Sequence, residues 1–418
     1  MKQLRVIPGL VLGLLCAVML LPSTRVHAAV VGELGAGKVV VGLEEVGAAE
    51  VGMSERGLKR VDALVERAIA RGVTPGAALA VGRRAGVVRL RGYGRLDWRR
   101  GYDRVTPHTL YDLASLTKTV GTTTAVMLLV QDGKLDVGAP VGRYLPDWVE
   151  AGEVEEVTVE QLLTHRSGLR ADLPLGRYGW TREGLYRSLG MAGLVYAPGT
   201  RTVYSDYGMA LLGALVEEVS GEPLDSLLER RVFRPLGMYD TGFNPLKWPE
   251  TRVVEEAVAA GRSILERTAP TERVKGRYLH GVVHDRAAQL LGGVAGHAGL
   301  FSSAADLAVF AQMLLHGGEY GGVRVLEPGV VERFTSRASS RFALGWELAW
   351  PETNLADYFS PRAYGHTGFT GTSLWIDPVR DVFVVLLTNR VNPTSRERRH
   401  LKLREEVHAA VVAAIERE

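Results

Sequence analysis

Leu110–Lys118 reads LYDLASLTK and leads into the run Thr119–Val130, which reads TVGTTTAVMLLV. This run is apolar on nearly all sides, which predicts a buried helix that ends near Asp132. Ser115 and Lys118 are three residues apart at the start of that helix, so both side chains would lie on one face within reach of each other. A surface lysine would be out of place on a buried helix. The stretch therefore predicts a buried helix that begins with a serine–lysine pair.

This pair has the composition of a nucleophile and its base. A serine hydroxyl needs a base, and a desolvated lysine beside other polar groups can lose its proton and serve as one. The first N–H groups of a helix are also free to bind an oxyanion. By chance alone S-x-x-K occurs about once in 400 residues at ordinary residue usage. The alternative is therefore a helix-start serine followed by an unrelated lysine.

Secondary-structure patterns upstream of this stretch predict a helix and two strands. Apolar residues keep helical spacing from Ser54 until Gly72, which ends the helix. Residues 77–93 predict two β runs around the turn Arg83–Gly86.

Downstream, residues 371–377 and 382–389 predict a hairpin whose turn contains Asp377 and Pro378. Residues 401–417 predict a closing amphipathic helix. Strands at both ends with helices between them predict an α/β (α+β) fold. In it, one antiparallel sheet is flanked by N- and C-terminal helices, with an all-helical region inserted.

The expected organisation has four parts. Residues 1–28 are an export signal and 29–53 a linker. Residues 54–119 plus 291–418 form the α/β sheet domain, and 120–290 form the mainly helical inserted region.

The export signal is indicated by Lys2 and Arg5, the apolar run Val6–Leu21 and small residues at Val26–Ala28. The alternative is an uncleaved membrane anchor, although the apolar run is shorter than the roughly 20 residues of a full span. The expected location is the periplasm or the extracellular space, with membrane association possible through this segment.

The charge balance points away from nucleic acid. Three of the 50 basic residues and none of the 47 acidic ones lie in residues 1–28, so the remaining chain is balanced at 47 of each. The one cysteine, Cys16, also lies there, so no thiol chemistry is expected in the remainder.

Two other patterns suggest different chemistry. Gly32–Lys38 fits G-x-x-x-x-G-K but continues with Val39 and opens no predicted helix, which argues against a phosphate loop. A zinc site would combine three histidines and an aspartate, but glycines crowd this segment and no base of the HExxH type accompanies it; its residues are His280, His284, Asp285 and His297. We therefore expect neither a metal nor another cofactor.

Several landmarks then occur together. They are S-x-x-K at Ser115, LLTHRSGL at Leu162–Leu169, YSD at Tyr204–Asp206, PLGMYDTGF at Pro235–Phe243, GHAGLFSSAADLAVFAQML at Gly296–Leu314 and HTG at His366–Gly368. In this order they resemble the serine β-lactamase and penicillin-binding protein superfamily, on its class C, DD-peptidase and esterase-like branch. The segment from His284 through GHAGLF and the GHTGFTGTSLWIDP stretch most resemble the penicillin-binding protein type 4B group. The resemblance spans about residues 54–390 and implies a β-lactamase/transpeptidase-like fold.

The resemblance also implies catalytic roles. Ser115 would be acylated, Lys118 would accept its proton, and Tyr204 would pass the proton to the leaving group; taken alone, Tyr204 is equally a packing residue. Asp206 departs from the asparagine usual in the family. Its carboxylate would either pair with Lys118 and hold it charged, or orient an amine-bearing substrate.

The HTG segment would form the substrate side of the site. His366, Thr367 and Gly368 stand in the place of the K-T-G strand, and the N–H of Phe369 would share the oxyanion with that of Ser115. A neutral histidine binds a substrate carboxylate less firmly than an ammonium does. The alternative for His366 is a strand-edge histidine bonded to the backbone, and His165 is expected to be structural.

The resemblance thus implies an exported serine hydrolase with an acyl-enzyme on Ser115, most like a D-alanyl-D-alanine carboxypeptidase acting on cell-wall peptides. A carboxylesterase and a weak β-lactamase are the alternatives within this fold. A non-catalytic penicillin- or cell-wall-binding protein, in which Asp206 disables proton transfer, is the alternative from another class. A metal hydrolase is the third class. The expected partner is a small-molecule or peptide substrate.

Overall fold

The computed structural model describes residues 43–99, 101–145, 153–173, 188, 193–249, 262–349, 355 and 357–416. The predicted export signal and the Gly32–Lys38 motif lie outside these residues. Within the described ranges, no helix has the length and apolar character needed to cross a bilayer.

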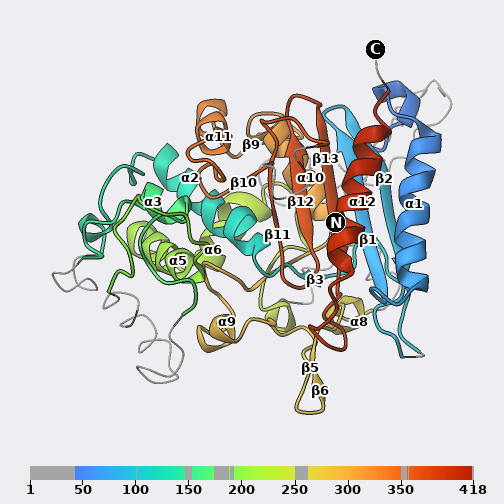
Figure 1. Cartoon of the computed structure of the whole chain (residues 1–418), viewed down its shortest axis with the longest axis horizontal. Helices are drawn as coiled ribbons and strands as arrows, with labels where there is room; N and C mark the ends of the chain where they lie inside the picture. The colour runs from blue at the N-terminus through green and yellow to red at the C-terminus, as the bar shows by residue number, and fades with distance from the viewer. Residues whose placement is uncertain are drawn as a thin grey trace, which may run out of the picture.

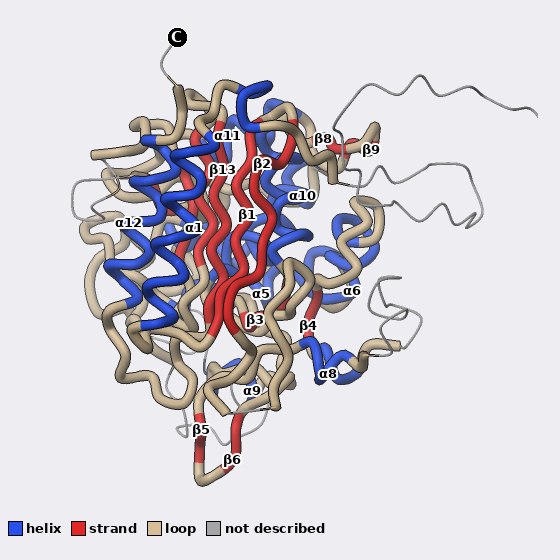
Figure 2. The backbone as a smooth tube through the Cα atoms, turned by 90° about the vertical axis from the view of Figure 1, so that its right-hand side faces the viewer, coloured by secondary structure: helices blue, strands red, loops and turns tan. Residues whose placement is uncertain are grey.

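A six-stranded antiparallel sheet joins the two ends of the chain (Figures 1 and 2). Its strand order is β10-β11-β12-β13-β1-β2. The strands are β1 (Gly76–Arg83), β2 (Gly86–Gly94), β10 (Glu347–Leu348), β11 (Tyr364–Thr367), β12 (Ser373–Asp377) and β13 (Val382–Thr388). The join is made where β13 pairs with β1, from Ala77 opposite Thr388 to Gly82 opposite Phe383. The predicted antiparallel sheet built from both termini is confirmed.

Two helices from opposite ends of the chain cover one face of this sheet. They are α1 (Glu55–Ala70) and α12 (His400–Ala413), which lie side by side in Figure 2. Helix α1 begins after Ser54, whose hydroxyl accepts a bond from the Gly57 N–H at 3.3 Å. Apolar side chains of both helices and of the sheet form one core here, with Leu79 of β1 fully buried in it. The other face packs against α10 (Ala304–Leu315) and the helical part of the molecule.

The inserted region is mainly helical, but it is not purely so. Its helices and those that follow are α2 (Thr124–Gln131), α3 (Val159–Leu163), α5 (Asp206–Ser220), α6 (Leu224–Leu228), α8 (Ile264–Arg267), α9 (Arg286–Leu290) and α11 (Pro328–Thr335). Shorter or wider helical turns are η1 (Ala48–Val51), η2 (Thr117–Thr123), η3 (Val141–Arg143), η4 (Glu229–Phe233) and η5 (Pro245–Lys247). Of the small sheets, β4 (Gly242–Phe243) and the hairpin of β5 (Arg273–Val274) with β6 (Arg277–Tyr278) contribute strands to this region, whereas β3 (Tyr111–Asp112), β7 (Leu300–Ser302) and the hairpin of β8 (Glu319–Tyr320) with β9 (Val323–Arg324) lie outside it.

The described end of the predicted linker, residues 43–53, belongs to the folded unit. The Val46 N–H donates to the Val87 carbonyl at 3.0 Å, and the Val87 N–H donates to the Glu44 carbonyl at 2.8 Å. Met53 is buried against α1 and α12. These residues therefore pair with the edge strand β2 and are not a free linker, because their backbone groups find hydrogen-bond partners on that strand.

Replacing Leu79 with alanine should destabilise the fold by about 2–5 kcal/mol, because the side chain is fully buried between the sheet and α1 and α12. Urea unfolding followed by circular dichroism measures this. Val379→Ala is the control: that side chain is 66% exposed in the β12–β13 turn, and its loss should cost less than about 0.5 kcal/mol. Equal costs for the two variants would contradict the assigned core.

Candidate active site

The segment before η2 holds Ser115 in a constrained turn. Ala114 has φ of 46°, a left-handed conformation that is uncommon for a residue other than glycine. The Ala114 N–H donates to the Asp112 carboxylate at 2.8 Å, and the His284 N–H donates to its other oxygen at 2.6 Å. Asp112 thus ties the turn that presents Ser115 to the segment around His284.

Lys118 lies one turn after Ser115, in the π-helical segment η2, and is 1% exposed. Its Nζ donates to the Ser115 Oγ at 3.0 Å and to the His297 carbonyl at 2.9 Å. The same Nζ lies 2.6 Å from the Asp206 Oδ1. The serine–lysine pair that the spacing predicts is therefore in contact, and the ammonium also contacts the His297 carbonyl and the Asp206 carboxylate.

Asp206 holds Lys118 in its charged form. Burial alone would lower the pKa of Lys118, but its interactions with Tyr204 and Asp206 raise that pKa above the ordinary value. Burial also raises the pKa of Tyr204, so at neutral pH the phenol is protonated. The sequence is compatible with two roles for Asp206, pairing with Lys118 or orienting an amine-bearing substrate. The 2.6 Å contact is the pairing with Lys118.

Tyr204 lies directly before α5, with its ring close to the Lys118 ammonium. The Nζ is 5.0 Å from the ring centroid, and contacts of the phenol with Lys118 and Ser115 act to lower its pKa against the effect of burial. The His165 ring packs 4.7 Å from that of Tyr204, and its Nδ1 accepts the Ser205 N–H at 3.1 Å. His165 is buried, and burial with the Lys118 charge lowers its pKa. Its contacts are those of a residue that fixes the start of α5.

The HTG segment at His366–Gly368 does not line the cleft, whereas Phe369, which follows it, does. His366 on β11 is 3% exposed, and its Nδ1 lies 2.8 Å from the Thr367 carbonyl, to which it donates. Burial lowers the pKa of His366 to about 4, so the ring is neutral at pH 7. Its centroid is 5.8 Å from that of Tyr204. His366 thus backs Tyr204 and bonds the backbone, as the strand-edge alternative expects.

Gly368 allows β11 to approach the nucleophile turn. A Cβ at this position would clash with the Leu113 carbonyl oxygen and the Thr372 hydroxyl. Phe369 follows and is 50% exposed. Among the described residues, no group of the chain accepts a bond from the N–H of Ser115 or of Phe369. These two amides therefore remain open to an oxyanion.

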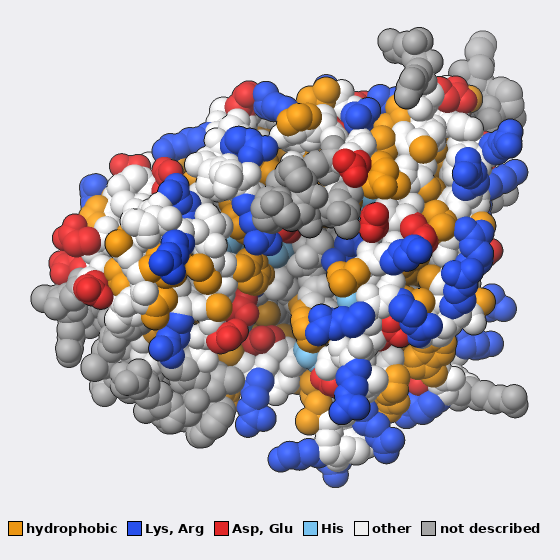
Figure 3. Space-filling view, viewed as in Figure 1, with side chains coloured by type: hydrophobic (Ala, Val, Ile, Leu, Met, Phe, Trp, Pro, Cys, Tyr) orange, Lys and Arg blue, Asp and Glu red, His pale blue; other side chains and the backbone are white. Residues whose placement is uncertain are grey.

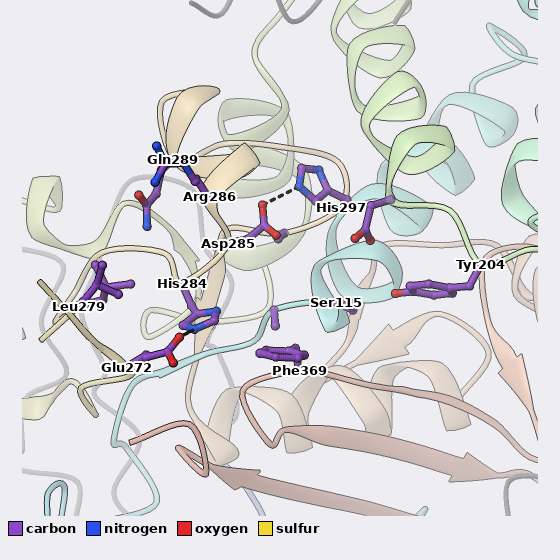
Figure 4. A pocket seen from close by; sticks show the side chains of 14 residues that line it. Ser115, Tyr204, Glu272, Leu279, His284, Asp285, Arg286, Gln289, His297 and Phe369 are labelled. Atoms are coloured by element: carbon purple, nitrogen blue, oxygen red, sulfur yellow. Dashed lines mark hydrogen bonds and ion pairs between the residues drawn. The ribbon is translucent and has the colours of Figure 1, made fainter. Parts of the chain in front are cut away.

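A cleft of about 510 Å³ opens at Ser115 (Figure 4). Among the described residues, its lining consists of Ala114, Ser115, Tyr204, Asp206, Glu272, Val274, Leu279, His284, Asp285, Arg286, Gln289, His297, Ala298 and Phe369. Figure 4 shows Tyr204 and His284 on opposite sides of Ser115 and Phe369. His366, Thr367 and Gly368 are not among these lining residues.

Two histidine–carboxylate pairs in the cleft wall were not predicted. The His284 Nε2 bonds Glu272 at 2.9 Å, and the His297 Nε2 bonds Asp285 at 2.9 Å. Burial alone would raise the pKa of Asp285, but the bond to His297 holds it below the usual range. Because the carbonyl of His297 also contacts Lys118, the second pair helps to fix the ammonium. The only signal for it in the sequence is the position of His297 within the GHAGLF landmark.

The histidines considered for zinc are held by separate partners. His280 bonds the Thr268 carbonyl at 2.7 Å, while His284 and His297 bond different carboxylates. His280 and His284 do not lie on a helix, so their spacing does not bring them to one face. The described part of the chain contains no group of three or more His, Cys, Asp or Glu side chains arranged to hold a metal ion.

Comparison with known proteins agrees with this geometry. Residues 61–409 match the family model described as Beta-lactamase. The chain belongs to the beta-lactamase family. The predicted family and the β-lactamase/transpeptidase-like fold are both confirmed, and the chain is a serine hydrolase of this family.

Two relatives of the chain are named as an amidase and a carboxypeptidase. The chain is 35% identical over 364 residues to a Bacillus subtilis (strain 168) protein named "N-acetylmuramyl-L-alanine amidase", covering 80% of this chain and 81% of the relative. It is 34% identical over 305 residues to an Escherichia coli (strain K12) protein named "Putative D-alanyl-D-alanine carboxypeptidase". That match covers 69% of this chain and 70% of the relative. Among solved structures, EstCE1, a hydrolase with promiscuous acyltransferase activity, superposes with a TM-score of 0.68 at 22% identity, over 85% of this chain and 98% of that one.

Proposed function

We propose that this protein is an exported serine hydrolase that forms an acyl-enzyme on Ser115 and removes the terminal residue of cell-wall peptides, as a D-alanyl-D-alanine carboxypeptidase does. The observation that carries the chemistry is the 3.0 Å contact between Lys118 Nζ and Ser115 Oγ at the base of the cleft. The cell-wall names of two relatives at 34–35% identity support the substrate class. The expected location outside the cytoplasm follows from residues 1–28.

The acylation step moves one proton through the Lys118 amine. The reactive form of the site has a neutral amine, formed when the Lys118 ammonium loses its proton to solvent, and the Asp206 carboxylate 2.6 Å away opposes that loss. The Ser115 Oγ then attacks the substrate carbonyl while its proton passes to Nζ. The N–H groups of Ser115 and Phe369 stabilise the oxyanion. Tyr204 relays the proton to the leaving amine, and water later attacks the acyl-enzyme to release the acid and restore the hydroxyl.

A carboxylesterase is the second candidate, favoured by the state of His366. A neutral, buried imidazole gives the HTG segment no fixed positive charge, so this segment provides no ionic contact to a substrate carboxylate. An ester substrate does not need that contact. The same property weighs against efficient turnover of a β-lactam, whose carboxylate the family's lysine would bind.

The test is a substrate panel with the purified protein. A D-Ala-D-Ala peptide, a short p-nitrophenyl ester and nitrocefin are compared by kcat/KM, and a fluorescent penicillin reports acylation of Ser115. Preferential release of D-alanine supports the carboxypeptidase; turnover of the ester alone supports the esterase. Stable labelling without turnover of any substrate contradicts both and favours a binding protein. Activity that is lost to chelators and survives Ser115→Ala would establish a metal hydrolase instead.

Asp206→Asn should shift the pH dependence of the reaction. Removing the carboxylate leaves burial as the main influence on Lys118, so the pKa of its ammonium falls. Because the neutral amine is the reactive form, the rising limb of kcat/KM against pH should move to lower pH by about one unit or more, which is tenfold in the neutral fraction below the limb.

Glu218→Gln is the matched control for this variant, since it removes an exposed carboxylate at the other end of α5. It should leave the pH profile unchanged. A raised KM for amine-bearing substrates with no movement of the limb would assign Asp206 to substrate binding instead.

A further inference from the structure

A group of cations borders the cleft on two segments that bond each other. We call it the basic rim; its members are Arg273, Lys275, Arg277, Arg396 and Arg398. The first three lie on the β5–β6 hairpin, which projects from the molecule in Figure 1, and the others on the loop before α12. The Arg273 N–H donates to the Pro393 carbonyl at 3.0 Å, so the two segments form one surface. Figure 3 shows Lys and Arg side chains gathered at the projecting hairpin.

The positive charge of the basic rim is not neutralised within the described chain. All five side chains are exposed, and none forms an ion pair with a described carboxylate. The nearby acids are already engaged. Glu272 accepts the Ser395 N–H and hydroxyl at one oxygen and bonds His284 at the other, while Glu397 pairs with Arg399. This edge of the molecule therefore carries positive charge that no described carboxylate offsets.

The basic rim is continuous with the cleft that contains Ser115. Val274, between two members of the rim, and Leu279, directly after β6, line the cleft. An acyl donor that reaches Ser115 along this wall would continue over the hairpin. A short donor would end inside the cleft and would not reach the exposed side chains at the tip.

We propose that the basic rim binds the carboxylate-bearing remainder of a polymeric cell-wall substrate while the scissile end lies at Ser115. This inference rests on the proposed cell-wall function and narrows it, because it makes the substrate an anionic polymer and not a short free peptide. Exposed cations attract a polyanion over about a Debye length, near 8–10 Å at physiological salt. Such attraction raises association rates by about tenfold or more and weakens as salt is added.

The experiment compares two triple charge reversals in the full chain. One changes the rim at the hairpin, R273E/K275E/R277E. The other, R56E/K59E/R60E, makes the same change of charge on exposed residues in the first turns of α1, at the opposite end of the molecule from the hairpin (Figure 1). Each variant is tested for cosedimentation with insoluble peptidoglycan, for kcat/KM on that polymer, and for kcat/KM on p-nitrophenyl acetate.

The rim variant should lose about tenfold or more in binding to peptidoglycan and in kcat/KM on it. High salt should lower both values for the unaltered protein toward those of the rim variant. The ester should be turned over equally by all three proteins. Equal losses in both variants, or none in either, would overturn the proposal. So would loss of binding to anionic phospholipid vesicles without loss on peptidoglycan. Cosedimentation needs no turnover, so it still decides the role of the rim if the unaltered protein hydrolyses only the ester.

Discussion

Ser115→Ala should lower kcat by about four to six orders of magnitude and abolish covalent labelling by a fluorophosphonate or a fluorescent penicillin. Removing a serine nucleophile that acts with its base costs an enzyme of this kind about as much as removing the whole catalytic unit. The fold should be unaffected, because the side chain is only partly buried and its hydroxyl is bonded within a polar site to Lys118 and Tyr204. Intact-protein mass spectrometry measures the acyl adduct, and stopped assays measure turnover.

Ser340→Ala is the matched control, because it removes an exposed serine hydroxyl away from the cleft. It should retain both labelling and turnover. Persistent turnover in Ser115→Ala, with a melting curve like that of the unaltered protein, would show that another group carries out the reaction. The histidine–carboxylate pairs of the cleft wall would then be the first residues to test.

Local patterns predicted most of the large sheet because each strand and turn carries its own signal. The hairpin expected at 77–93 is β1 with β2, and the pair expected at 371–377 and 382–389 is β12 with β13. The pairing of β13 with β1 joins residues about 300 positions apart. No periodicity encodes which strands become neighbours at that distance, and the prediction of one sheet from both termini depended on the order of the elements, with strands at both ends and helices between them.

The site residues that belong to sequence motifs could be predicted. The contacts that form between loops could not. Ser115, Lys118 and Tyr204 belong to ordered landmarks, and the structure brings them into contact. The Glu272–His284 pair depends on the path of a loop and a two-residue hairpin, for which the sequence shows only glycines and charges. The position of His366 behind Tyr204 is likewise a consequence of tertiary packing, since its motif predicts a cleft residue as readily as a buried one.

The pairing of Lys118 with Asp206 separates two roles that the lysine could have. A charged ammonium at 3.0 Å can stabilise negative charge on the Ser115 oxygen without accepting a proton. A neutral amine can accept the proton, but the ammonium must first lose its own proton beside the Asp206 carboxylate. The raised pKa of Lys118 makes the charged form the resting one, so the cost of reaching the neutral form is part of the barrier.

Lys118→Met and Lys118→Arg should each lower kcat/KM by about two to four orders of magnitude, the range expected for loss of a general base. Methionine removes both roles of the lysine. Arginine keeps a permanent positive charge opposite Asp206 but does not give up its proton at accessible pH. The comparison is made by steady-state kinetics on the best substrate of the panel, at a temperature where circular dichroism shows both variants folded.

Similar losses in the two variants would mean that proton transfer to the amine is the indispensable role. A Lys118→Arg protein that kept most of its activity would instead assign the lysine to charge stabilisation and leave Tyr204 as the proton acceptor. Lys402→Arg is the matched control, because it makes the same change on an exposed side chain of α12. The pH profile gives a second criterion: without an amine that titrates, the limb that moves in Asp206→Asn should be absent from Lys118→Arg altogether.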